Sequence, residues 1–391
     1  MKSITARTSF AISLSLALLF LGACKPSSIP QTTSTGYSYP EYKTPLYDPS
    51  KKTVLVIADN DGTEMFDMMA PFYLFSATEK VNVYIVAEKK SRIIVKRGLY
   101  AMPQFTFSEI DSLNIQADVM VVPNQSRGAG NQKMVTVNFI KKHYTGENRI
   151  LSVCDGSATV AATGLYDGKA LTTHSSDYAE VKKHFNKPAW VLGTTVTQSG
   201  NLFSTAGVAN ATEGSLAVIN DVFGMETMQQ VLSLIHYPYP EIRRDHQNLV
   251  IGNNPIYVGL GKGTIKKSEK VGVLLQDGIS EFDLAAVLDC YYRSFPSSID
   301  TFIVGGSTVT SKYGLTLLAT GDANNNSSTE LHVLMPEKFS ETEKSLFKNA
   351  QFVTYDKQEQ QYMIDACLKR ISALYGNEFG SFVKLMLDYN N

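Results

Sequence analysis

The sequence predicts an α/β protein made of two three-layer α/β/α domains, the second of them reduced. Apolar β runs alternate with helix-compatible segments in both halves, a pattern typical of parallel sheets with helices on both faces. The segment VLVIADNDGTEMFDMMAPF (54–72) also aligns with KVGVLLQDGISEFDLAAVL (270–288) at an offset of 216, which places Phe66-Asp67 on Phe282-Asp283. The chain has 391 residues, 43% of them hydrophobic, which is enough for two buried cores.

Charge and cysteine content exclude two classes of protein. The chain has 36 basic and 37 acidic residues, whereas nucleic-acid binding requires a basic surplus. Four cysteines are too few for a disulfide scaffold of this length. We therefore expect a small-molecule partner and no nucleic acid.

Residues 1–23 read as an export signal. Lys2 and Arg7 precede an apolar stretch, Phe10 to Leu21, which spans only about 18 Å as a helix against the ~30 Å of a bilayer core. It ends in Leu21-Gly22-Ala23-Cys24, which resembles the bacterial lipobox and predicts lipidation (palmitate) of Cys24 and membrane anchoring. A plain secretory signal followed by a chance cysteine is the alternative.

Residues 24–50 are rich in Pro, Ser and Thr and show no helix or strand period, so they are predicted to be a tether. Lys25 follows the lipidation site, and no acidic run comes next. In bacteria that retain lipoproteins at the inner membrane by an aspartate there, this pattern favours the outer membrane, facing the periplasm.

The predicted domains are residues 51–240 and 270–391, joined by a connector at 241–269. In the first, ENRILSVCDGSATVAATGLYDGKALTTH (147–174) runs from a strand through a tight turn into a helix. The matching strand of the second is AQFVTYDKQ (350–358), with Tyr355 or Asp356 at the turn. Roughly fifty residues or more are missing after it, so we expect this copy to be non-catalytic and to cap or shape the cleft of the first.

Cys154 is the candidate nucleophile. A nucleophile on a sharp strand-to-helix turn needs small neighbours two residues away on each side, which Ser152 and Gly156 provide. The positive end of the following helix is expected to lower the thiol pKa and favour the thiolate. The alternative is a buried structural cysteine.

Together with GLYDGKALTTH (164–174) and NLFSTAGVANATEGSLAVINDVFG (201–224), this turn resembles the ThiJ/PfpI family. The resemblance covers residues 53–240 and is nearest to the isonitrile hydratase-like and amidase-like branch. It implies a flavodoxin-like, class I glutamine amidotransferase-like fold, with the second copy matching only in its early strands and last helix.

The resemblance also implies residue roles. Cys154 would be the nucleophile, Asp67 the carboxyl group that hydrogen-bonds its sulfur, and His174 a neighbour of the cysteine. Backbone N–H groups of Asn124 and Asp155 would bind an oxyanion, although the glycine pair common in the family is absent after Pro123. A plain helix N-terminal acid is the alternative for Asp67, and a structural histidine for His174.

These features predict a cysteine-dependent hydrolase or hydratase at the cell envelope, acting on a small C–N or carbonyl substrate without cofactor or metal. The alternative is a non-catalytic lipoprotein that binds a ligand or senses oxidants through Cys154. Cys290 and Cys367 are expected to be buried free thiols, with a disulfide between them left open. A homodimer is also left open.

Overall fold

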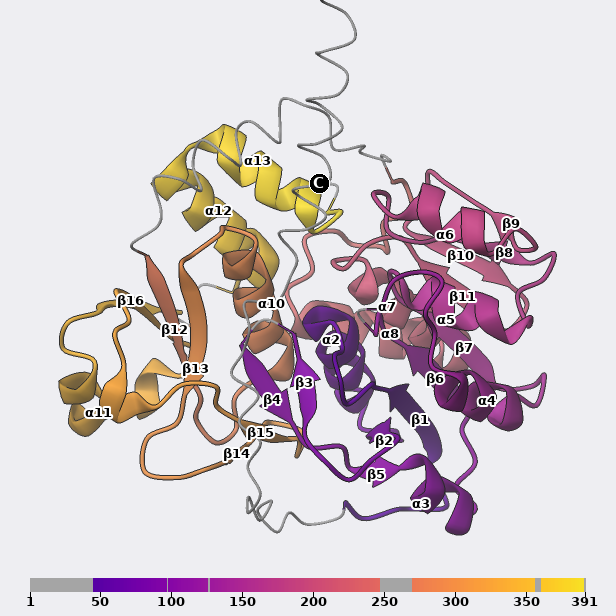
Figure 1. Ribbon diagram of the computed structural model, residues 1–391, viewed down its shortest axis with the longest axis horizontal. Helices are drawn as coiled ribbons and strands as arrows, with labels where there is room; N and C mark the ends of the chain where they lie inside the picture. The colour runs from indigo at the N-terminus through magenta and orange to yellow at the C-terminus, as the bar shows by residue number, and fades with distance from the viewer. Residues whose placement is uncertain (1–44, 97, 126, 247–268, 356–359, 390–391) are drawn as a thin grey trace, which may run out of the picture. The chain divides into compact units, whose positions relative to one another are not determined.

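The computed structural model describes residues 45–96, 98–125, 127–246, 269–355 and 360–389 (Figure 1). The predicted signal peptide, the predicted lipidation site Cys24 and most of the tether and connector lie outside these ranges. All described residues belong to one unit, Tyr42–Asn391. None of the helices in these ranges is both long enough and apolar enough to cross a membrane.

A seven-stranded sheet organises the first half. Its strand order is β10-β11-β7-β6-β1-β2-β5, and every neighbouring pair is parallel except β10 with β11. The strands are β1 (Lys52–Ile57), β2 (Val81–Ala87), β5 (Phe105–Thr106), β6 (Val119–Val122), β7 (Arg149–Ser152), β10 (Val196–Ser199) and β11 (Leu202–Thr205).

Strand β1 is buried on both faces, because successive side chains of a strand point to opposite sides. Val54 and Val56 enter a core shared with α2 (Met65–Ser76), α7 (Ala211–Phe223) and α8 (Met225–Leu234). Leu55 and Ile57 enter a second core with α3 (Phe107–Ser112), α4 (Met134–His143) and α5 (Gly156–Thr163). Beyond β7, a small parallel pair, β8 (Ala170–Leu171) and β9 (Ala189–Trp190), flanks α6 (Tyr178–His184). The predicted α/β class is confirmed.

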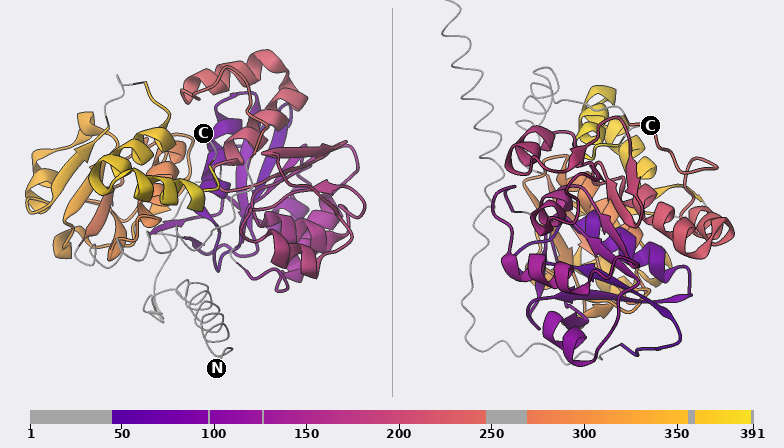
Figure 2. Two further views of the ribbon diagram at one scale, coloured as in Figure 1. Left: turned by 90° about the horizontal axis from the view of Figure 1, so that it is seen from above. Right: turned by 90° about the vertical axis from the view of Figure 1, so that its right-hand side faces the viewer.

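The second half has a smaller parallel sheet of order β13-β12-β16-β17. Its strands are β12 (Lys270–Leu274), β13 (Ser298–Phe302), β16 (Glu330–Val333) and β17 (Gln351–Thr354). Its helices are α10 (Glu281–Tyr292), α11 (Glu341–Leu346), α12 (Met363–Tyr375) and α13 (Asn377–Met386), with α12 and α13 side by side (Figure 2). The order matches β2-β1-β6-β7 of the first sheet. A glycine of positive φ also separates α7 from α8 (Gly224, 84°) and α12 from α13 (Gly376, 91°).

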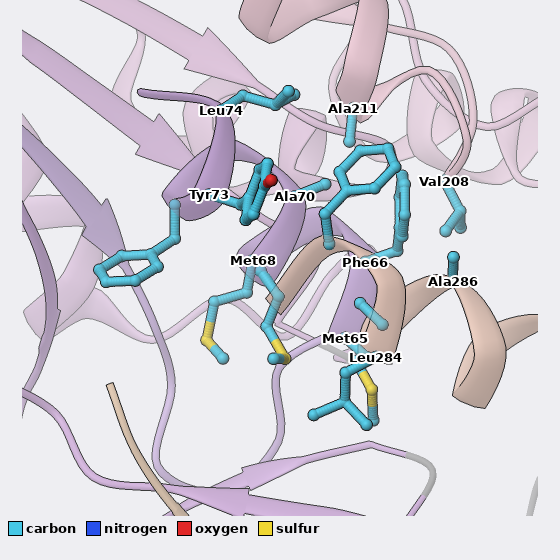
Figure 3. Packing of buried hydrophobic residues seen from close by; sticks show 14 of the residues in the cluster. Met65, Phe66, Met68, Ala70, Tyr73, Leu74, Val208, Ala211, Leu284 and Ala286 are labelled. Carbon is cyan, nitrogen blue, oxygen red and sulfur yellow. The ribbon is translucent and has the colours of Figure 1, made fainter. Parts of the chain in front are cut away.

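The two halves share one hydrophobic core, centred on α2 and α10 (Figure 3). The rings of Phe66 and Phe282, which the sequence repeat aligns, lie 5.2 Å apart edge to face. Two hairpins, one from each half, add an antiparallel sheet of order β14-β15-β4-β3, in which β15 pairs with β4. Its strands are β3 (Ile93–Val95), β4 (Leu99–Ala101), β14 (Val309–Thr310) and β15 (Thr316–Leu318).

Candidate active site at Cys154

Cys154 occupies a strained turn between β7 and α5. Its φ is 55°, a left-handed value that a non-glycine residue adopts only when its surroundings enforce it. Gly156 makes the turn possible, because a Cβ at this position would lie 2.0 Å from the Val122 carbonyl oxygen. Ser152 is fully buried behind the turn. The small residues on both sides of Cys154 therefore permit the sharp strand-to-helix geometry that the sequence predicts.

Asp67 is a fully buried carboxyl group in the first turn of α2. The Asn124 N–H donates a hydrogen bond to its Oδ2 at 3.1 Å, and its Oδ1 has no hydrogen-bond partner among the described residues. Burial, followed by the nearby Glu64, raises the pKa of Asp67 well above its ordinary value, while the Asn124 N–H opposes the rise. Burial therefore favours the protonated form of the Asp67 carboxyl group, which has an O–H to donate.

The thiol of Cys154 is also held neutral. Only 2% of Cys154 is exposed. Burial, followed by the nearby carboxyl groups of Asp67, Asp155, Glu64 and Asp177, raises its pKa well above the ordinary value. The expectation that the helix N-terminus favours a thiolate is therefore wrong, because burial and acidic neighbours outweigh the helix dipole.

Asp155 adds a second carboxyl group beside the turn. The Thr173 hydroxyl donates to Asp155 Oδ1 at 2.8 Å, and the Ser157 hydroxyl donates in turn to Thr173 at 2.7 Å. Burial, followed by the charge of Asp177, raises the pKa of Asp155 well above its ordinary value. Because the groups around the thiol are acidic, an anionic substrate is disfavoured there.

The oxyanion role expected for Asn124 is not what the structure shows. Its N–H already donates to Asp67, so it holds the carboxyl group rather than facing an oxyanion. The Asp155 N–H, which follows the sulfur-bearing residue directly, has no acceptor within the described ranges. Of the two backbone N–H groups that the sequence suggested for oxyanion binding, the one of Asp155 therefore remains.

His174 is buried beside the turn, and its side chain bonds elsewhere. Its Nδ1 accepts the Ser176 N–H at 3.2 Å and lies 2.8 Å from the Ser176 hydroxyl. The neighbouring Thr173, rather than His174, contacts the Cys154 carbonyl oxygen, at 3.4 Å. The next residue, Ser175, donates its N–H and its hydroxyl to Asp388 Oδ2 at 3.1 and 3.0 Å. The end of the second half thus lies directly against the His174 loop.

Three residues at this site escaped the sequence analysis: Glu64, Thr173 and Arg293. Glu64 immediately precedes α2, and Arg293 immediately follows α10, where its side chain binds Glu64 at 3.0 Å. The one sequence signal for Thr173 was its position next to His174, a predicted site residue. Nothing local marks Arg293, because it reaches the site through tertiary packing.

Outside this site, metal ligation and the other cysteines were the remaining candidates for chemistry. No group of three His, Cys, Asp or Glu side chains in the described ranges is placed to hold a metal ion. Cys290 and Cys367 are free and fully buried, in agreement with the sequence-based expectation. Asp283, the repeat partner of Asp67, is partly exposed in the first turn of α10, and its N–H is capped by the Ser280 hydroxyl.

Comparison with known proteins identifies the first half. Residues 52–221 match the model of the DJ-1/PfpI family. Isonitrile hydratase of Pseudomonas putida is 28% identical over 182 residues, which cover 45% of this chain and 75% of the relative. Drosophila melanogaster protein dj-1beta is 24% identical over 182 residues, which cover 46% of this chain and 94% of the relative.

Solved structures cover the same half. Drosophila melanogaster DJ-1beta aligns with a TM-score of 0.44 at 22% identity, over 48% of this chain and all of that one. A ThiJ/PfpI family protein from Pseudomonas syringae aligns with a TM-score of 0.43 at 20% identity, over 50% of this chain and 83% of that one. The match to the family model identifies residues 52–221 as a domain of the DJ-1/PfpI family, with a flavodoxin-like α/β fold.

Proposed function

We propose that this domain is a cysteine-dependent hydratase of small uncharged C–N substrates, with isonitriles as the favoured class. The observation that carries the proposal is a buried thiol on a strained turn near a fully buried carboxyl group, Asp67, whose Oδ1 has no hydrogen-bond partner among the described residues. The similarity to an isonitrile hydratase supports the same substrate class. An acidic, largely water-excluded site favours a neutral substrate over an anionic one.

The site contains the groups that isonitrile hydration needs. The Cys154 sulfur attacks the terminal isonitrile carbon and forms a C–S bond, while Asp67 delivers its proton to that carbon and takes up the thiol proton. Water then adds to the same carbon and the C–S bond breaks, which returns the thiol and releases a formamide. The sum is isonitrile plus water giving formamide, with no oxidant or cofactor. In the proposed reaction the Asp155 N–H assists the addition of water.

The test is turnover of a panel of small alkyl and aryl isonitriles, followed as formamide formation. Cys154→Ala should abolish turnover while leaving folding intact. Asp67→Asn should lower the rate by about 10²–10⁴-fold, because an amide donates a hydrogen bond but cannot transfer a proton. Cys290→Ala, which removes another buried thiol, is the matched control and should retain the wild-type rate. Activity that survives Cys154→Ala would refute the mechanism.

A ligand-binding protein without catalysis is the second candidate. The observation that favours it is the Asn124 N–H, which is bonded to Asp67 and leaves one backbone donor fewer for an oxyanion. Oxidant sensing is disfavoured, because a thiol held neutral by burial and acidic neighbours reacts slowly with peroxide. Saturable binding of isonitriles to Cys154→Ala, with no turnover by the wild type, would support this candidate.

We further propose that the two halves arose as copies of one domain and that the second shapes the site of the first. The common strand order, the glycine-separated helix pairs and the Phe66–Phe282 contact support this proposal. The repeat at an offset of 216 supports it independently from the sequence.

The lipid anchor is also a proposal, supported by the Leu21-Gly22-Ala23-Cys24 sequence. Cys24→Ala should block lipidation and leave an unanchored or unprocessed precursor. Detergent partitioning and mass spectrometry of the mature N-terminus would measure this. A mature chain that begins elsewhere and carries no lipid would contradict the anchor.

A further inference from the structure

A buried arginine from the second half reaches the helix that carries Asp67. The side chain of Arg293 is 4% exposed, and its NH2 donates to Glu64 Oε1 at 3.0 Å. Its NH1 donates to Asp289 Oδ1 at 2.8 Å, and its Nε donates to the Met386 carbonyl oxygen at 3.0 Å. Acceptors from three separate segments therefore fix the guanidinium in one orientation.

The two residues whose side chains bind Arg293 also hold the first turn of α2, Asp289 through its carboxylate and Glu64 through its backbone N–H. Asp289 Oδ2 accepts the Phe66 N–H at 3.1 Å. The Glu64 N–H donates to the Asn124 carbonyl oxygen at 2.8 Å, and the Asn124 N–H donates to Asp67 Oδ2 at 3.1 Å. Contacts through Glu64 and Asn124 thus link Arg293 to the carboxyl group of Asp67.

The arrangement is one-sided. At the repeat offset of 216, position 293 corresponds to Ala77, which ends α2. The second half therefore contributes the guanidinium of Arg293 to the half that carries the Cys154 turn. The first half has only the methyl group of Ala77 at the equivalent position. If the contact only joined α2 to α10, an arginine at position 77 would serve equally well.

We propose that Arg293 is a positioning residue of the Cys154 site, which binds the side chains of Glu64 and Asp289 and so fixes the α2 turn that presents Asp67. The proposal assigns the second half a direct part in the reactivity of the thiol. It rests on the proposed function only in taking Cys154 as the reactive group. The charges agree with it, since Arg293 lowers the pKa of Asp67 whereas Glu64 and Asp289 raise it.

After burial, the groups with the largest effect on the pKa of the Cys154 thiol are acidic. Four carboxyl groups raise the pKa of the Cys154 thiol. Asp67 lies in the first turn of α2 and Glu64 immediately precedes that helix. Asp155 follows Cys154 in the same turn, and Asp177 immediately precedes α6. Glu64 is the member of this set that Arg293 binds directly. Removal of the guanidinium therefore leaves the negative charge of Glu64 without compensation, and this charge raises the pKa of the thiol further.

The experiment is the rate of iodoacetamide alkylation of Cys154 in the full chain, measured by peptide mapping across the pH range in which the thiol titrates. In Arg293→Met, the uncompensated carboxylates should move the Cys154 profile to higher pH and slow alkylation about three- to tenfold at a given pH. Adding Glu64→Gln to that variant removes one of these charges and should return the profile toward the wild type. Arg370→Met is the control, since it removes another guanidinium, bound to Glu330 and Tyr291 in the second half, and should leave the profile unchanged.

Glu64→Gln alone keeps the test decisive if Arg293→Met does not fold, because it leaves no unpaired carboxylate at Glu64. It should move the Cys154 profile to lower pH and speed alkylation by a similar factor. A folded Arg293→Met or Glu64→Gln protein with the wild-type profile would overturn the proposal, as would a shift that the double variant does not reduce. Labelling needs no substrate, so a shifted profile without isonitrile turnover would reject the proposed function and leave this inference standing.

Discussion

Replacing Gly156 by alanine tests whether the turn geometry presents the sulfur. The new Cβ would lie 2.0 Å from the Val122 carbonyl oxygen and 3.0 Å from the Pro123 carbonyl carbon and oxygen, all of them backbone atoms that no side-chain rotation can move aside. The Val122 oxygen also accepts the Val153 N–H at 3.0 Å. Relief of the clash must therefore separate β6 from the turn and weaken that bond.

The expected cost combines overpacking, about 1–3 kcal/mol, with a weakened backbone hydrogen bond, about 1 kcal/mol. Gly156→Ala should thus lower the free energy of unfolding by about 2–4 kcal/mol and slow both Cys154 alkylation and isonitrile turnover. Urea denaturation and peptide mapping would measure these effects.

Gly128→Ala is the matched control for this substitution. A Cβ at Gly128 meets nothing within 4 Å, so its stability should stay within about 0.5 kcal/mol of the wild type. A Gly156→Ala protein as stable and as reactive as the Gly128→Ala protein would refute the role given to the turn.

Two further predictions concern charges that the second half buries. Although burial opposes it, hydrogen bonds from His332 and Arg370 lower the pKa of Glu330 to about 2. A depressed carboxyl pKa stabilises the fold above the unfolded pKa, and the stability is lost as pH falls toward 2. Glu330→Gln should therefore reduce the acid-induced loss by about 3 kcal/mol in urea titrations below pH 4.5, and identical acid losses in both proteins would contradict this. Asp388→Asn weakens the buried contact between His246 Nε2 and Asp388 Oδ1, at 3.2 Å, and should cost about 1.5–3 kcal/mol, whereas an unchanged melting temperature would show that the contact contributes nothing.

Local pattern was sufficient to predict the fold class and the shape of the turn. Strand alternation is a property of short segments, and the small residues at 152 and 156 flank Cys154 within the same turn. The Phe66-Asp67 motif could be found because the second half repeats it. The repeat did not reveal that the two phenylalanines meet, because that contact depends on how α2 packs against α10.

The charge state of the thiol could not be predicted from the turn alone. A helix N-terminus lowers a cysteine pKa, but Glu64 and Asp177 are far from Cys154 in sequence and reach it only in the folded protein. Arg293 lies 139 residues beyond Cys154 and gives no local signal. The pairing of β15 with β4 is equally non-local, since it joins segments more than 200 residues apart.

The most direct test of the account is the mass of the Cys154 peptide after acid quenching of the protein during turnover of a slowly hydrated aryl isonitrile. The account predicts an adduct equal to the mass of one isonitrile on Cys154 and on no other cysteine. This adduct should be absent from Cys154→Ala and should decay as formamide appears. Formamide production without any adduct on Cys154, at a rate that Cys154→Ala retains, would contradict it.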